Sequence, residues 1–144
     1  MTTQAIFHTP DPKNEPVKSY KKGKESLVRV HKVDFAGDIL YEESDRSGLI
    51  WDAMKQLAAN NGHSVLVLIR EGSIDTLLER LGARNSKIDS KEQNIREYGV
   101  GAQILVDQGV RKMRLITNTL PKLIGLEAYD IELAGITPLL SNGR

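Results

Sequence analysis

The sequence predicts an α/β domain in which helices flank a mixed β-sheet. Short runs of strand length alternate with helical patterns, which is the order that α/β domains show. The length of 144 residues fits one domain, and 40% hydrophobic with 27% charged residues is ordinary for a globular fold. With 20 basic and 19 acidic residues the net charge is +1, so we expect no nucleic-acid partner. Residues 1–16 contain no long apolar run, so we expect no membrane partner and residence in the cytoplasm.

The chain is expected to begin with a lead-in segment or linker over residues 1–26, followed by the domain over residues 27–144. Three prolines break regular structure in this first segment: Pro10, Pro12 and Pro16. Residues 26–33 (SLVRVHKV) then alternate β-branched with polar residues, which predicts a half-buried strand.

A polar turn and an amphipathic helix follow this strand. The expected apolar face of the helix has the spacing i, i+4, i+7 and i+8: Ile50, Met54, Leu57 and Ala58. Ser47 or Asp45 can cap its start, and Gly62 can close its end in the left-handed conformation. Residues 64–69 (SVLVLI) are a short apolar run, which predicts a strand that is buried on both faces.

The second half continues the alternation of helix and strand. We expect a short helix over 73–82, a polar loop over 83–90, a helix from Ser90 to Gly109, a strand over 112–116, a helix over 119–128 and a last strand over 131–134. Ser90 with Gln93 forms a capping-box pattern, and Thr119 with Pro121 suits a helix start.

Residues 96–127 read REYGVGAQILVDQGVRKMRLITNTLPKLIGLE, and this run resembles the C-terminal signature of GTP cyclohydrolase II. The resemblance extends from about Leu27 to Leu139 and is densest in GAQIL, GVRKMRL and TN. It implies a GTP cyclohydrolase II-like fold in a single domain and a homodimer. It also implies an ancestral reaction in which a zinc ion, held by three cysteines, helps to open the guanine ring of GTP.

The chain contains no cysteine. The family's zinc motifs can be aligned without gaps on four shared residues: His31, Gly37, Asp38 and Gly48. The three cysteine positions then fall on Asp34, Asp45 and Ser47, and two carboxylates with one hydroxyl replace three thiolates poorly. Magnesium on Asp34 and Asp45 is an alternative, although such acids are more often exposed turn residues. We therefore predict no catalytic zinc, no metal site and no cofactor.

The loop that meets the substrate in active members reads EGRGIGL, whereas residues 71–77 read EGSIDTL. The arginine that would meet phosphate oxygens is Ser73 here, and the two glycines are Ile74 and Thr76. Glycine lets the backbone approach a ligand closely, and these replacements do not. We therefore expect that this loop no longer binds a nucleotide.

The segment after that loop, residues 82–95, is shorter than in active members and has no counterpart of their catalytic tyrosine. In active members an acidic residue stands two positions before an arginine, which is Arg96 here. The position of the acid holds Asn94, which cannot act as a general base because its amide does not titrate. We predict no catalytic residues. The positions that contact the nucleotide in active relatives, and that keep their residue type here, are vestigial: Arg29, His31, Glu71, Arg96, Thr117 and Lys122.

Each of these six positions also has an ordinary structural interpretation, such as a bonded strand histidine, a salt-bridged arginine or a solvated lysine. We favour the structural interpretation because the positions around them are lost. The chain as a whole resembles the degenerate domain that is fused C-terminally to 3,4-dihydroxy-2-butanone 4-phosphate synthase in riboflavin biosynthesis. This resemblance implies an inactive domain with a structural, dimerising or regulatory role, and a synthase domain as its fused partner.

Two alternatives stay open. One is a working nucleotide hydrolase of the GTP cyclohydrolase II type that uses other residues, among them Arg96, Thr117 and Lys122. The other is a sensor module that binds a nucleotide or a phosphate ligand.

Overall fold

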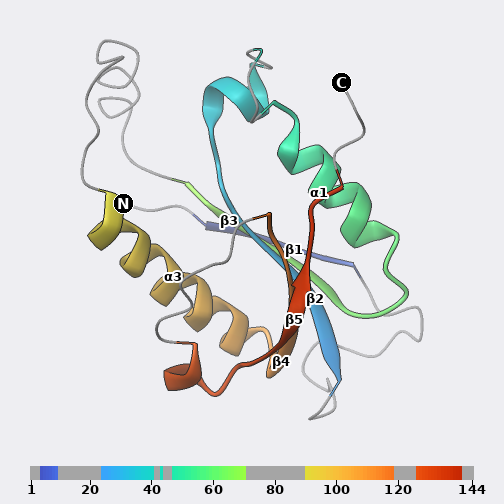
Figure 1. Cartoon of the computed structure of the whole chain (residues 1–144), viewed down its shortest axis with the longest axis vertical. Helices are drawn as coiled ribbons and strands as arrows, with labels where there is room; N and C mark the ends of the chain where they lie inside the picture. Colours follow the sequence, from blue (N-terminus) through green and yellow to red (C-terminus); the bar gives the residue numbers. More distant parts are fainter. Residues whose placement is uncertain are drawn as a thin grey trace.

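The computed structural model describes residues 4–9, 24–40, 43, 47–70, 90–118 and 126–140, and it confirms the α/β class (Figure 1). The elements in chain order are β1 (Gln4–Thr9), β2 (Glu25–Lys32), the π-helical turn η2 (Phe35–Ile39), α1 (Leu49–Ala58), β3 (Ser64–Ile69), α3 (Ser90–Asp107), β4 (Lys112–Ile116), the 3-10 turn η3 (Glu127–Tyr129) and β5 (Glu132–Thr137). None of the described helices is long and apolar enough to cross a membrane.

The five strands form one mixed sheet in the order β1-β3-β2-β4-β5. Strands β2, β3, β4 and β5 run parallel, and β1 pairs antiparallel with β3. The chain passes from β2 to β3 through α1 and then returns past β2 to β4 through α3. Because the two crossovers travel in opposite directions across the sheet, their helices lie on opposite faces (Figure 1).

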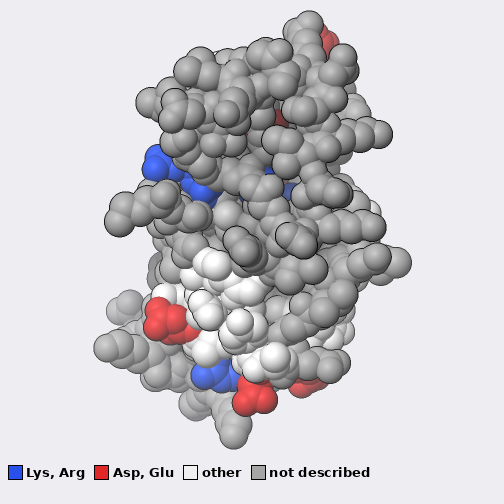
Figure 2. Space-filling model, turned by 90° about the vertical axis from the view of Figure 1, so that its left-hand side faces the viewer, with Lys and Arg blue, Asp and Glu red and all other residues white. Residues whose placement is uncertain are grey.

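Each helix covers its own hydrophobic core. On one face, Ala102 and Leu105 of α3 pack with alternate residues of β3, Val65, Val67 and Ile69. The approach is close at Gly101, where an added Cβ would lie 3.7 Å from a methyl group of Val30. Seen from the α3 side, the described surface is mostly uncharged, with scattered acidic and basic groups (Figure 2).

On the other face, Ala53 and Leu57 of α1 pack with Leu66, Ile116 and Leu139. The alternation along β3 therefore divides its side chains between two cores, as expected for a strand that is buried on both sides. The prediction of a strand over 64–69 is confirmed at its bounds, as is that over 112–116.

Strand β1 lies inside the segment 1–26 that was expected to be a lead-in or linker, so that expectation is wrong for residues 4–9. Its residues pair with β3 from Gln4 opposite Ile69 to Thr9 opposite Ser64. The prolines do not prevent this strand, because the first of them, Pro10, comes in the sequence after its last residue, Thr9.

The predicted apolar face of α1 is confirmed at Leu57 and wrong at Met54 and Ala58. The helix buries Asp52, Ala53 and Leu57, whereas Met54 and Ala58 are exposed. The hydrophobic spacing predicted the helix correctly, but the side chains of the sheet that pack against the helix determine which of its faces is buried. The outer surface of α1 is consequently more apolar than that of a typical surface helix.

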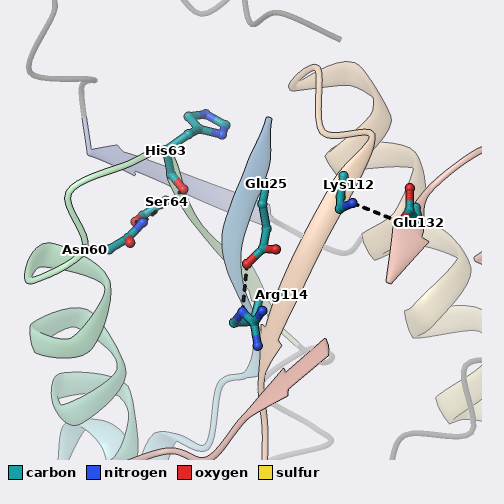
Figure 3. A network of polar contacts seen from close by, with 7 residues as sticks. All are labelled: Glu25, Asn60, His63, Ser64, Lys112, Arg114 and Glu132. Carbon is teal, nitrogen blue, oxygen red and sulfur yellow. Dashed lines mark hydrogen bonds and ion pairs between the residues drawn. The ribbon is translucent and has the colours of Figure 1, made fainter. Parts of the chain in front are cut away.

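The ends of α1 also differ from expectation. The residue at the N-cap position is Gly48, with a φ of 70° and no side-chain cap, and not Ser47; Asp45 lies outside the described residues. At the other end Ala59 is right-handed, and Gly62 has no positive φ. Asn60 Nδ2 instead donates to the carbonyl oxygen of His63 at 3.3 Å and to Ser64 Oγ at 2.9 Å (Figure 3).

The other predicted elements are confirmed with small shifts or lie outside the described part. Strand β2 begins at Glu25, β5 runs over Glu132–Thr137 rather than 131–134, and α3 ends at Asp107, two residues before Gly109 with its φ of 80°. The helix over 73–82 and the loop over 83–89 lie outside the described residues. Of the helix expected over 119–128, only the end is described, and it belongs to η3.

The amino ends of the parallel strands carry a row of ion pairs (Figure 3). Arg114 Nε donates to Glu25 Oε1 at 2.7 Å, and Lys112 Nζ lies 3.1 Å from Glu132 Oε1. These pairs link β2 to β4 and β4 to β5 across the sheet. They are partly exposed, so each contributes at most about 1 kcal/mol.

Candidate functional site

The candidate site lies at the carboxyl ends of β2 and β4. In open α/β sheets, ligands bind outside the carboxyl ends of strands at the point where connections leave to opposite faces. Here β2 occupies that point, because α1 follows it on one face and α3 returns past it on the other. Arg29 and His31 alternate with Val28 and Val30 along β2, so they point to the α1 face.

The Arg29 side chain is hydrogen-bonded to the end of the neighbouring strand, β4. Its Nη1 donates to the carbonyl oxygen of Ile116, the last residue of β4, at 2.9 Å. Its Nη2 lies 3.5 Å from His31 Nδ1. The guanidinium therefore spans from β4 to the next side chain on its own face of β2.

His31 and Asp38 form a buried pair. His31 Nε2 lies 2.7 Å from Asp38 Oδ2, and both side chains are no more than 2% exposed. The same Oδ2 accepts the backbone N–H of Asp34 at 2.8 Å, and the backbone N–H of Asp38 donates to the carbonyl oxygen of Asp34 at 2.7 Å. One carboxylate oxygen thus ties the turn after β2 to the strand. Asp38 Oδ1 is buried and has no hydrogen-bond partner among the described residues.

The sequence interpretation of His31 as a bonded strand histidine is confirmed, but it did not identify the partner. Asp38 served only to align the family motif, and it lies seven residues after His31. The turn η2 brings the two together, and its i to i+5 geometry has no periodic signature in the sequence. A Gly-Asp pair shortly after a strand was the available signal.

The remaining predicted site residues are only partly placed. Thr117 follows the Ile116 carbonyl that Arg29 binds, and its own N–H donates to the carbonyl oxygen of Thr137 at 2.9 Å. The backbone of Arg96 belongs to α3, on the opposite face of the sheet from Arg29. Glu71 and Lys122 lie outside the described residues. The structure therefore brings together Arg29, His31 and the β4 end that leads to Thr117.

The positions aligned with the family's cysteines hold Asp34 and Ser47 in the described part, while Asp45 lies outside it. No group of three or more His, Cys, Asp or Glu side chains that could hold a metal occurs among the described residues. The described donors at these positions are one carboxylate and one hydroxyl group, and no thiolate exists anywhere in the chain. This donor set does not fit the three-thiolate zinc centre that the family resemblance implies.

A second histidine forms a pair that the sequence analysis missed. Ser26 Oγ lies 2.9 Å from His63 Nδ1, a distance typical of a nucleophile and its base. Ser26 is 0% exposed, so no substrate reaches its hydroxyl. The backbone N–H of Leu27 also donates to the carbonyl oxygen of His63 at 2.9 Å. The pair therefore fastens the start of β3 to the start of β2.

The arrangement around Arg29 and His31 suits holding a structure more than moving protons. A general base must reach the proton that it abstracts, and His31 is nearly inaccessible behind η2. The one strongly cationic group of the cluster, Arg29, already donates within the chain.

Comparison with known proteins assigns the chain to a protein family. Residues 3–138 match the model of a protein family described as GTP cyclohydrolase II. The chain is similar to the "Probable monofunctional riboflavin biosynthesis protein RIBA 3, chloroplastic" of Oryza sativa subsp. japonica, with 39% identity over 132 residues that cover 83% of this chain and 25% of the relative. It is also similar to the "Riboflavin biosynthesis protein RibBA" of Mycobacterium marinum, with 36% identity over 130 residues, 81% of this chain and 31% of the relative. RibBA of Mycobacterium tuberculosis is 35% identical over 130 residues. The chain spans between a quarter and a third of the length of these relatives.

Proposed function

Because this chain belongs to the GTP cyclohydrolase II family, we propose that it is a member that has lost the ring opening of GTP. In this proposal it serves riboflavin biosynthesis in the cytoplasm as a structural, dimerising or regulatory domain. Its partner is a 3,4-dihydroxy-2-butanone 4-phosphate synthase domain of the same polypeptide.

The observation that carries the proposal is the donor set at the family's zinc positions. Ring opening needs a metal-bound water that is nucleophilic near neutral pH, and the family obtains it from three thiolates with one open position. Here those positions are Asp34, Asp45 and Ser47, and the chain has no cysteine elsewhere to substitute for them.

The contacts of the retained side chains support the same conclusion. Arg29 donates to the Ile116 carbonyl and His31 is buried against Asp38. These contacts within the chain account for the presence of both side chains without a bound nucleotide. A scaffold role keeps such residues because their loss would leave buried polar groups unpaired.

The association with a synthase domain is supported by the relatives. Two of those compared are called RibBA and are about three times longer than the matched region, which covers 31% of each. The remainder of such a protein has room for a second domain of ordinary size.

A dimerising role is supported by the outer surface of α1. Trp51 is 47% exposed and Met54 is 36% exposed, and they lie three residues apart on one side of the helix. Exposed aromatic and methionine side chains are enriched where proteins meet. Light scattering on the purified chain should give the mass of a dimer, and a monomer at micromolar concentration would argue against this role.

The test of lost catalysis is incubation of the full chain with GTP and zinc, followed by measurement of formate release and of metal content. We expect neither turnover nor a full equivalent of zinc, with an active member of the family as the positive control. Formate release by this chain would overturn the proposal. A matched variant, D34C/D45C/S47C, should take up zinc, which would show that these positions and not the surrounding scaffold limit metal binding.

A further inference from the structure

We infer that Arg29, His31 and Asp38 form a positioning relay that couples the end of β4 to the turn η2, with His31 held as the neutral tautomer that carries its proton on Nε2. This inference goes beyond the proposed function, since it concerns how the turn is held whether or not GTP is converted. Arg29 is the positioning residue, because it acts on the turn through His31.

The chemistry of the two groups beside the His31 ring determines the direction of each hydrogen bond. A guanidinium has five N–H donors and no acceptor, so in the long contact of 3.5 Å between its Nη2 and His31 Nδ1 it can only donate, and an unprotonated Nδ1 can accept. Asp38 Oδ2 accepts at 2.7 Å from Nε2, which must then carry the proton. A proton on Nδ1 would face the cation of Arg29, so the two neighbours of the ring select the same neutral tautomer.

The relay connects the end of β4 to the turn η2. Its start is the carbonyl oxygen of Ile116, which lies 87 residues from Arg29 along the chain. Its end is Asp38 Oδ2, which also accepts the N–H of Asp34 and so fixes the first turn of η2. The relay thus runs from one backbone group, the carbonyl of Ile116, to another, the N–H of Asp34, and its Arg29 and His31 side chains lie on one face of β2.

Several short hydrogen bonds of the turn meet at Asp38. The N–H of Gly48 also approaches the carbonyl oxygen of Gly37 at 3.5 Å, the same length as the contact between Arg29 Nη2 and His31 Nδ1. Three short bonds of the turn, at 2.7 and 2.8 Å, involve Asp38. A change in the orientation of the His31 ring should therefore be felt at the amide of Asp34.

The direct test is the tautomer of His31 by long-range nitrogen–proton correlation on the whole chain at neutral pH, with the signal assigned by loss in His31→Gln. We expect a protonated Nε2 and an unprotonated Nδ1. A proton on Nδ1, or on both nitrogens, would overturn the inference.

Coupling is tested by amide hydrogen exchange at Asp34 in Arg29→Lys. Lysine keeps the charge but presents one compact head, which cannot span the Ile116 carbonyl and His31 Nδ1 together. We expect exchange at Asp34 to become about tenfold faster, the effect of losing one hydrogen bond to a charged group.

The matched control is Arg114→Lys, which alters an arginine on β4 that pairs with Glu25 at the opposite edge of the sheet. It should leave exchange at Asp34 unchanged. Equal rates at Asp34 in the two variants would overturn the coupling. Neither readout involves GTP, so failure here is distinguishable from failure of the proposed function.

Discussion

Asp38 offers the sharpest test of how the carboxyl edge of the sheet is held. Replacement by alanine removes the acceptor of two donors, the Nε2–H of the buried His31 and the backbone N–H of Asp34. Leaving a buried donor unpaired costs about 1–3 kcal/mol, and the Asp34 amide is only partly buried, so we expect a total of about 3 kcal/mol. For a domain of this size each kcal/mol lowers the melting temperature by about 3–4 °C, so the loss should be about 10 °C.

The control is Asp38→Asn. Both hydrogen bonds end on Oδ2, so the single amide oxygen of asparagine can accept both of them, while its NH2 takes the place of Oδ1. The asparagine variant should therefore lose no more than about half as much stability as the alanine variant. Urea unfolding followed by tryptophan fluorescence and circular dichroism measures both. An alanine variant within about 0.5 kcal/mol of the wild type, or an asparagine variant equal to alanine, would refute the account of the shared oxygen.

Three further predictions test the rest of the fold. Ser64→Ala removes a buried hydroxyl that accepts from Asn60 and donates to the carbonyl oxygen of Leu57 near the end of α1, and urea unfolding should show a loss of about 1–2 kcal/mol; an unchanged midpoint would contradict a stabilising role of these two hydrogen bonds. Gly135→Ala places a Cβ 2.9 Å from Arg114 Nη1, so calorimetry should show a loss of about 1 kcal/mol that disappears in an Arg114→Ala background; a loss that persists there would contradict the proposed clash. Leu66→Ala should cost about 2–5 kcal/mol because Leu66 is in the core, and Met54→Ala in the monomer no more than about 0.5 kcal/mol because Met54 is on the surface; equal costs would show that the helix is placed wrongly.

The sequence predicted well those elements whose pattern is local. The apolar run 64–69 and the strand 112–116 appear at their expected bounds because each is buried on both faces or alternates with period two. Strand β1 escaped prediction because its partner lies more than fifty residues away, and no local pattern reports that pairing. The burial phase of α1 escaped prediction for a similar reason, since the sheet below it decides between two apolar stripes.

The candidate site was predictable in part. The family resemblance selected Arg29 and His31, and the structure places them side by side on one face of β2. It did not reveal that Asp38 anchors the histidine, because that contact depends on a π-helical turn. The residues of the middle segment, Glu71 among them, stay predictions.

The position of β1 has a consequence for how the chain assembles during synthesis. Strand β1 is synthesised before the other described strands of the sheet, yet the one described strand that it pairs with is β3, which follows more than fifty residues later. Until β3 emerges, the backbone groups of Gln4–Thr9 must be satisfied by water. Pairings of such high sequence separation slow folding, so the outermost strand should be among the last parts of the sheet to become protected.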